Sequence, residues 1–306
     1  MLCIPFVSHP NYSFNFPAKH RFPMDKFGLL QQRVRDLGLL TDDNLYTPSS
    51  CSAADLSVAH CPHYIRNFDL DELDVKAMRR MGLPWSEGLR TRTFLSPNGT
   101  LLAAELALEH GIACHLAGGT HHAHYEFGSG FCIFNDLAYA ARKIILMGKA
   151  RRILIFDCDV HQGDGTAAIL QQDDDIYTCS VHCEKNFPHR KSTSNFDVGL
   201  SKGLSDSAYL DRVSETLAHC FTTFQPDFVL YDAGVDVWQH DPLGLLDISL
   251  DGIRRRERRV LNYCKDKRVP VATVIGGGYD KNQVALAQRH CIVAEVAHEV
   301  FVQGAN

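Results

Sequence analysis

Short apolar runs alternate with longer segments of helical spacing along most of the chain, and this alternation limits the possible folds strongly. The apolar runs, each ending in polar or glycine residues, are typical of buried strands and span residues 2–7, 112–116, 152–156, 176–181, 228–231 and 269–275. The helical segments span residues 24–37, 101–109, 136–147, 206–224, 252–265 and 282–302. This order predicts a three-layer α/β/α fold with a central, mostly parallel sheet.

Composition narrows the class of protein further. No break in composition divides the 306 residues, so we expect residues 1–306 to form a single domain. The net charge of −5 gives no basic excess for nucleic-acid binding. The 11 cysteines include no Cys-x-x-Cys pair, and the first residues lack the basic start of a leader, so we expect a cytoplasmic protein with reduced thiols. No apolar run reaches the roughly 18 residues of a membrane span.

The densest clusters of His, Asp and Gly follow four of the apolar runs. They are residues 118–124 (GGTHHAH), 157–165 (DCDVHQGDG), 232–236 (DAGVD) and 276–279 (GGGY). In open α/β sheets, ligand sites form beyond the carboxyl ends of the strands. We therefore expect these four loops to meet at one edge of the sheet and to build a site there.

Asp159 and His161 are alternate residues of an extended strand end, so their side chains share a face. A carboxylate and an imidazole together suit Zn²⁺ or a similar divalent ion. Alone, the pair is more typical of a strand that ends in an Asp-Gly turn, but the three accompanying loops favour the metal. Asp236 is a plausible third ligand, although an isolated aspartate there would fit a turn or a helix cap.

His121 and His122 can place two imidazoles over a reacting water, with the preceding glycines allowing close backbone approach. Either histidine could instead be a metal ligand or a structural residue. His124 has no evident role and is interpreted as an ordinary loop histidine. The Tyr279 hydroxyl, after three glycines, can donate a hydrogen bond to an oxyanion.

Taken in order, GGTHHA, GFCIFND, DCDVHQGDGT, SVH, DAGVD and GGGY resemble the core of the histone deacetylase superfamily, with its arginase-like α/β fold. The segment HPNYSFNFPAKHRFPMDKF resembles the family's start, where a loop borders the site entrance. The order Asp-Cys-Asp-Val-His differs from the Asp-Ala-His-x-Asp of the binuclear manganese arginases and implies one zinc. HQGDG and the HRFPMDKF start resemble a compact, bacterial-type or class IV-like branch.

The resemblance implies catalytic roles for five residues. His121 and His122 match the tandem catalytic histidines, and Asp157 and Asp164 match the carboxylates that hydrogen-bond them. Tyr279 matches the tyrosine that polarises the scissile carbonyl. We favour His122 as base and acid, with His121 in electrostatic support.

The resemblance also implies metal and substrate positions. The residues that match zinc ligands are Asp159, His161 and Asp236. Those that match the walls of an acyl-lysine tunnel are Gly130, Phe131 and Phe187. A potassium site would use Asp157, Ser180 and Val181, with backbone oxygens of Asp159 and His161. A second potassium site would use the carbonyls of Leu170, Asp173 and Ile176.

The resemblance thus implies zinc-dependent hydrolysis of the acyl-amide of Nε-acyl-lysine in proteins or peptides, with acetyl or a longer acyl group. An acetylpolyamine or other small-molecule amidohydrolase is the alternative, and the absence of a long dimerisation insertion counts against it. A binding module for acylated lysine is less consistent with the intact catalytic positions. The sequence leaves open the acyl length, the physiological substrate and the oligomeric state.

Overall fold

The computed structural model describes residues 3–305, and its eight strands form one sheet. They are β1 (Phe6–Val7), β2 (Leu45–Tyr46), β3 (Ile112–His115), β4 (Ile153–Asp157), β5 (Ile176–Cys183), β6 (Phe196–Leu200), β7 (Phe228–Asp232) and β8 (Val271–Val274). The strand order is β2-β1-β3-β8-β7-β4-β5-β6, and every neighbouring pair is parallel. The predicted parallel sheet is confirmed.

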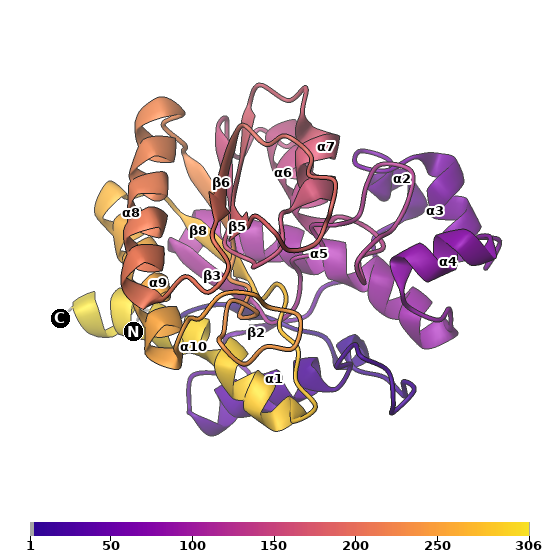
Figure 1. Ribbon diagram of the computed structural model, residues 1–306, viewed down its shortest axis with the longest axis horizontal. Coiled ribbons are helices and arrows are strands. Elements are labelled where there is room, and N and C mark those ends of the chain that lie inside the picture. The colour runs from indigo at the N-terminus through magenta and orange to yellow at the C-terminus, as the bar shows by residue number, and fades with distance from the viewer. Residues whose placement is uncertain (1–2, 306) are drawn as a thin grey trace.

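Helices cover both faces of the sheet, as the three-layer prediction requires (Figure 1). One face carries α1 (Lys26–Asp36), α8 (Asp206–Thr223), α9 (Leu250–Lys267) and α10 (Gln283–Phe301). The other carries α5 (Glu87–His110), α6 (Asp136–Leu146) and α7 (Asp164–Leu170). This division follows from right-handed crossovers, because connections that run in opposite directions along the sheet pack on opposite faces. Strands β4 and β7 are buried at every residue, as expected of strands covered on both sides.

Three short helices precede α5 in the chain, and the sequence pattern did not predict them. They are α2 (Ala53–Leu56), α3 (Pro62–Asp69) and α4 (Val75–Met81). Two single 3₁₀ turns, η1 (Pro10–Tyr12) and η2 (Gln303–Ala305), complete the elements. Strands β2 and β6 and helix α7 were also missed. The predicted strand 2–7 is observed as β1 only, and residue 2 lies outside the described residues.

Helix α5 begins at Glu87, well before the predicted start at residue 101. Pro97 and Gly99 interrupt the apolar spacing, which hid the first half of the helix. Gly99 is needed at this position, because a Cβ there would overlap the Tyr12 hydroxyl and the His115 ring. The prediction was wrong because packing against neighbouring elements outweighs local helix propensity.

All eleven cysteines are free thiols, and nine of them are buried. The free thiols agree with the prediction that the cysteines are reduced. Among residues 3–305, no helix combines the length and the apolar character needed to cross a membrane.

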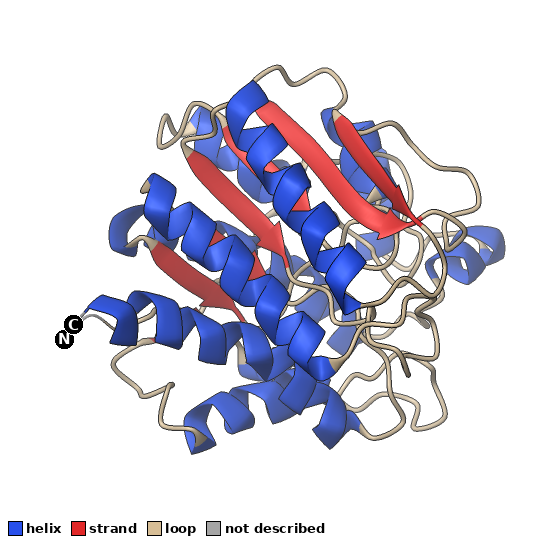
Figure 2. Ribbon diagram, turned by 60° about the vertical axis from the view of Figure 1, so that its left-hand side comes forward, coloured by secondary structure: helices blue, strands red, loops and turns tan. Residues whose placement is uncertain are grey.

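Strands β3, β8, β7 and β4 lie next to one another in the sheet. The four polar clusters follow these four strands, so the sheet brings the clusters together at its carboxyl edge. In Figure 2 the strand arrowheads point toward the side of the molecule where the long loops gather. The predicted convergence of the four loops is therefore confirmed.

Candidate active site

Asp159, His161 and Asp236 form a buried cluster with metal-ligand chemistry. Their ligand atoms all lie within 4.8 Å of one another. His161 Nδ1 is 3.0 Å from Asp159 Oδ1 and 3.1 Å from Asp236 Oδ2. One nitrogen and two carboxylate oxygens therefore face a common point.

The surrounding backbone turns these donors toward each other. Asp159 Oδ2 accepts a hydrogen bond from the Gly277 N–H at 2.6 Å, and Asp236 Oδ1 accepts one from the Val160 N–H at 2.9 Å. Burial, and then the charge of Asp159, raises the pKa of Asp236 to about 6. Two buried carboxylates this close repel each other unless a cation or a proton lies between them. The donor set fits a zinc ion, which favours nitrogen and oxygen ligands and keeps an open position in catalytic sites.

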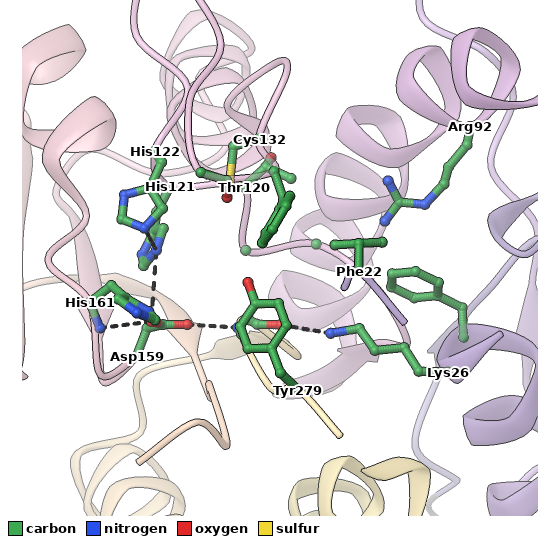
Figure 3. A pocket seen from close by; sticks show the side chains of 17 residues that line it. Phe22, Lys26, Arg92, Thr120, His121, His122, Cys132, Asp159, His161 and Tyr279 are labelled. Atoms are coloured by element: carbon green, nitrogen blue, oxygen red, sulfur yellow. Dashed lines mark hydrogen bonds and ion pairs between the residues drawn. The ribbon is translucent and has the colours of Figure 1, made fainter. Parts of the chain in front are cut away.

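His121 and His122 lie beside this cluster (Figure 3), and each ring is oriented by a carboxylate outside that view. His121 Nδ1 is 2.8 Å from Asp157 Oδ2, and His122 Nδ1 is 2.6 Å from Asp164 Oδ1. The two Nε2 atoms are 3.2 Å apart. Both pairs are buried. The structure therefore brings together the four residues that the sequence assigned to this arrangement.

The two histidines differ in the direction of their pKa shifts. Burial opposes the charged form of His121, but the charges of Asp157 and Asp159 outweigh it and raise the pKa of His121 well above its usual value. Burial, and then the charge of His121, lowers the pKa of His122 to about 4. His122 is thus the neutral ring at pH 7, and a neutral imidazole is the form that can accept a proton.

His124 lies in a loop, as predicted, and it makes two contacts that the sequence did not indicate. His124 Nε2 is 3.0 Å from Asp164 Oδ2, and its ring stacks on Phe127 with centroids 4.4 Å apart. Asp164 therefore joins His122 and His124. Burial opposes ionisation of Asp164, but its hydrogen bonds to both histidines lower its pKa below the usual value.

Tyr279 is 8% exposed and lies beside the metal cluster. Its backbone N–H donates to Asp241 Oδ2 at 2.7 Å, which fixes the end of the glycine loop. A Cβ at Gly277 would overlap the carboxylates of Asp159 and Asp236, so only glycine allows this loop to pass so close. Burial raises the pKa of Tyr279 well above its usual value, so the hydroxyl keeps its proton and can donate.

The predicted tunnel residues line a pocket of about 320 Å³ that opens outward from the site. We call it the outer pocket. The ring of Phe187 meets His122 edge-on, with centroids 4.8 Å apart, and Phe131 lies 5.8 Å from the Tyr279 ring. Gly130 leaves room for the His122 ring, which a Cβ would overlap. The other lining residues are Arg21, Arg79, Arg80, Met81, Gly82, His161, Asn186 and Leu243.

A second, smaller cavity of about 40 Å³ touches Asp159, His121 and Tyr279. We call it the inner cavity. Its walls include two charged side chains that sequence reasoning missed, Lys26 and Arg92, which are 3% and 5% exposed. Figure 3 shows Tyr279 between Asp159 and His161 on one side and Lys26 on the other.

Lys26 Nζ lies 3.4 Å from the carbonyl oxygens of Gly276 and Gly278 and 3.3 Å from His290 Nε2. Burial lowers the pKa of Lys26 to about 8. The Arg92 guanidinium lies 4.4 Å from the centre of the Phe27 ring. Neither cation forms an ion pair within residues 3–305. Only their burial distinguishes them, because lysine and arginine are rarely buried.

Asp232 is a further buried acid without a predicted role. It is fully buried, and both of its carboxylate oxygens lack a hydrogen-bond partner among the described residues. With His121 and Asp157 it forms a second cluster of possible metal ligands. Burial, and then the charge of Asp157, raises the pKa of Asp232 well above its usual value. The neutral acid is therefore the favoured form.

The predicted potassium residues lie on neighbouring strands. Asp157 of β4 is paired with Ser180 of β5, and Val181 follows Ser180. Ser180 Oγ is 3.1 Å from His182 Nδ1. At the second predicted position, the Leu170 carbonyl accepts the Asp173 N–H at 3.0 Å, and the Asp173 carbonyl accepts the Ile176 N–H at 3.1 Å. Both potassium sites stay predictions.

Comparison with known proteins relates the chain to one family. A family model described as the histone deacetylase domain matches residues 20–294. An uncharacterized protein of Picosynechococcus sp. is 48% identical over 297 residues, which cover 97% of this chain and 99% of that protein. Histone deacetylase 2 of Arabidopsis thaliana is 31% identical over 272 residues, covering 86% and 70% of the two chains. The acetoin utilization protein AcuC of Bacillus subtilis is 28% identical over 303 residues, covering 90% and 77%.

The fold agrees with this relationship. A crystal structure of an HDAC homolog complexed with SAHA matches with a TM-score of 0.82 and 21% identity, covering 98% of this chain and 89% of that one. The structural match shows a shared fold, and the family model spans most of the chain. The chain therefore belongs to the histone deacetylase family of hydrolases.

Proposed function

We propose that the protein is a zinc-dependent deacetylase that hydrolyses the amide of Nε-acetyl-lysine in a protein or peptide. The observation that carries this proposal is the meeting of the Asp159–His161–Asp236 cluster with His121, His122 and Tyr279 around one cavity. A zinc ion held by the cluster would act as a Lewis acid, polarising the amide carbonyl and lowering the pKa of the attacking water.

His122 is the proposed proton carrier. As the neutral ring of the pair, it accepts a proton from the attacking water, and it then gives a proton to the amine as the C–N bond breaks. Asp164 at its Nδ1 stabilises the charged form between these two steps. His121, paired with Asp157, supplies positive charge 3.2 Å away.

Tyr279 is the proposed oxyanion donor. Its hydroxyl keeps its proton, and its ring lies in the wall shared by the inner cavity and the outer pocket. A donor already in place requires little reorganisation when negative charge develops on the carbonyl oxygen. In the outer pocket, Phe131 and Phe187 would contact the lysine methylenes and exclude water.

The inner cavity favours acetyl over long acyl groups. A volume of about 40 Å³ holds a few waters, since roughly 10–15 Å³ of such volume suffices for one. A methyl group fits this space, whereas a long acyl chain would have to open a packed core. The buried cations Lys26 and Arg92 would also attract the carboxylate product.

We further propose that Asp157, Ser180 and Val181 hold a potassium ion between β4 and β5. The paired register of Asp157 and Ser180 supports the site. Because Asp157 also contacts His121, replacing potassium by sodium would change turnover if the site is used.

The test is a comparison of kcat/KM for an acetyl-lysine peptide and for acetylputrescine with zinc-loaded protein. An Asp159→Asn variant purified in parallel controls for contaminating hydrolases. We expect the peptide to be the better substrate and the variant to be inactive. Faster turnover of acetylputrescine would instead indicate a small-molecule amidohydrolase, and binding of the peptide without turnover would indicate a recognition module.

A further inference from the structure

Three arginines line the outer pocket together with the candidate catalytic residues. Arg21, Arg79 and Arg80 are exposed side chains that share this pocket with His122 and Tyr279. Among the described residues, no aspartate or glutamate lines it. A substrate that enters the outer pocket therefore passes positive charge without a compensating acid.

Helix α4 places two of these arginines at the tunnel. Asp74 caps the start of α4 by accepting the Ala77 N–H at 2.7 Å, and Gly82 ends the helix in the left-handed conformation. The Phe131 N–H donates to the Met81 carbonyl at 2.8 Å, which ties the last turn of α4 to the tunnel wall. Arg79 and Arg80 belong to that last turn.

The basic surface continues into a neighbouring pocket of about 650 Å³. This pocket shares Arg21 and Tyr279 with the outer pocket and adds Lys19 and Lys281. Its one acid, Asp280, is paired with Arg289 at 2.9 Å. We call this continuous surface the basic rim; it consists of Lys19, Arg21, Arg79, Arg80 and Lys281.

No acid neutralises the charges of the basic rim, although the Arg80 guanidinium lies 4.4 Å from the centre of the Phe127 ring. None of its members forms an ion pair in the described part of the chain. Two of the acids that precede α4 are engaged elsewhere: Asp69 pairs with Arg90, and Glu72 pairs with Arg66. The concentration of unpaired positive charge is local, because the whole chain carries a net charge of −5.

We propose that the basic rim selects acetyl-lysine that lies in an acidic peptide segment. This inference rests on the proposed deacetylase function and specifies the substrate class of the same site. The planar guanidinium group binds carboxylates with two parallel hydrogen bonds, and Arg79, Arg80 and Arg21 can present it to residues flanking the acyl-lysine. A basic flank would place like charges together at the entrance.

The test uses three peptides that differ only in the residues flanking acetyl-lysine, which are aspartate, asparagine or lysine. We expect kcat/KM at low salt to be highest for the aspartate peptide, about tenfold above the lysine peptide, since steering by local charge has effects of at least this size. In roughly 0.5 M salt this ratio should shrink to about twofold, because exposed charges are screened over a few ångströms.

Charge reversal tests the assignment to the rim. In an Arg79→Glu, Arg80→Glu variant, the preference should invert toward the lysine peptide. The single Arg21→Glu variant should reduce the ratio of kcat/KM between the aspartate and lysine peptides. It replaces the double variant as the test if the double variant does not fold. Arg212→Glu on α8, an exposed arginine away from both pockets, is the matched control and should keep the ratio of the unmodified protein.

The outcomes separate this inference from the proposed function. Equal kcat/KM for all three peptides at low salt would overturn the inference and leave deacetylation intact. An acidic preference that keeps its full low-salt size in 0.5 M salt, or in the Arg79→Glu, Arg80→Glu variant, would also overturn it, because its source would lie outside the rim. If none of the three peptides is hydrolysed in the presence of zinc, the proposed function itself is overturned.

Discussion

The inner cavity and the outer pocket meet at Tyr279, and both carry positive charge, yet they expose it differently. Lys26 and Arg92 in the inner cavity are at most 5% exposed, whereas Arg79 and Arg80 in the outer pocket are exposed. Charges in a buried site act strongly and are screened little, while exposed charges are weakened by salt. The inner cavity should therefore control the reaction, and the outer pocket should control which substrates arrive.

Tyr279→Phe tests the residue that lines both the inner cavity and the outer pocket, and we expect this change to have the largest effect on turnover. The change removes one hydroxyl donor and should lower kcat by about 10²–10³-fold while zinc binding and fold are kept. Steady-state kinetics, with metal content and circular dichroism measured on the same samples, check this. Unchanged turnover would show that the hydroxyl does not serve the reaction.

Lys26→Met tests the inner cavity alone. The ammonium group contacts the carbonyls of Gly276 and Gly278 in the loop that carries Tyr279, so its loss leaves buried carbonyls without a donor. We expect kcat to fall by about ten- to a hundredfold, equivalent to a lost hydrogen bond from a charged group. The loss should be the same at low and high salt, which distinguishes it from the rim variants. If the loss of kcat disappeared at high salt, Lys26 would behave like an exposed charge, and the distinction between the inner cavity and the outer pocket would be contradicted.

Acyl length tests the size of the inner cavity. Across otherwise identical acetyl, butanoyl and octanoyl peptides, kcat/KM should decrease, by about tenfold or more for octanoyl, because overpacking costs roughly 1–3 kcal/mol. If octanoyl were hydrolysed as fast as acetyl, the cavity of about 40 Å³ would have to widen on binding, and the long-chain alternative would gain support.

The site was predictable from sequence to the extent that its residues are clustered in sequence. Asp159 and His161 sit two residues apart, and His121 and His122 are adjacent, so their spacing carried the signal. The strands before them are continuous apolar runs, which made the parallel sheet predictable.

The charged side chains that line the inner cavity and the outer pocket were not predictable in the same way. Lys26, Arg92 and the basic rim are lone charges from separate segments, and only the fold determines that Lys26 is buried while Arg79 is exposed. Helix α4 was missed because its seven residues are too short to show a periodic pattern. The fully buried Asp232 gave no signal beyond its place in the DAGVD cluster.

The remaining expected effect concerns stability rather than turnover, and it arises at His60, a buried histidine that contacts the loop carrying His124. His60 Nδ1 lies 3.0 Å from the His124 carbonyl, and His60 Nε2 accepts the Asn135 N–H at 2.7 Å. Burial lowers the pKa of His60 from 6.5 to about 4. The unfolded chain therefore binds a proton between pH 6.5 and 4 that the folded chain excludes, so this contribution is complete above pH 6.5 and is lost as the pH falls to 4.

The loss from His60 should amount to about 3 kcal/mol at most. Urea unfolding at a series of pH values should show a shallower decline of the free energy of unfolding in His60→Gln than in the unmodified protein. His63→Gln, at an exposed position of α3, is the matched control. Parallel declines in the His60 variant and the unmodified protein would rule out this role.

Titration of chelator-stripped protein with Zn²⁺, while hydrolysis of an acetyl-lysine peptide is followed, tests the proposed deacetylase centre most directly. We predict that the rate saturates at one zinc ion per chain and that Asp236→Asn shows no activity at that ratio. A maximal rate that requires two ions per chain, which the second cluster of His121, Asp157 and Asp232 could accommodate, would contradict the single-zinc centre. No hydrolysis at any zinc concentration would contradict deacetylation.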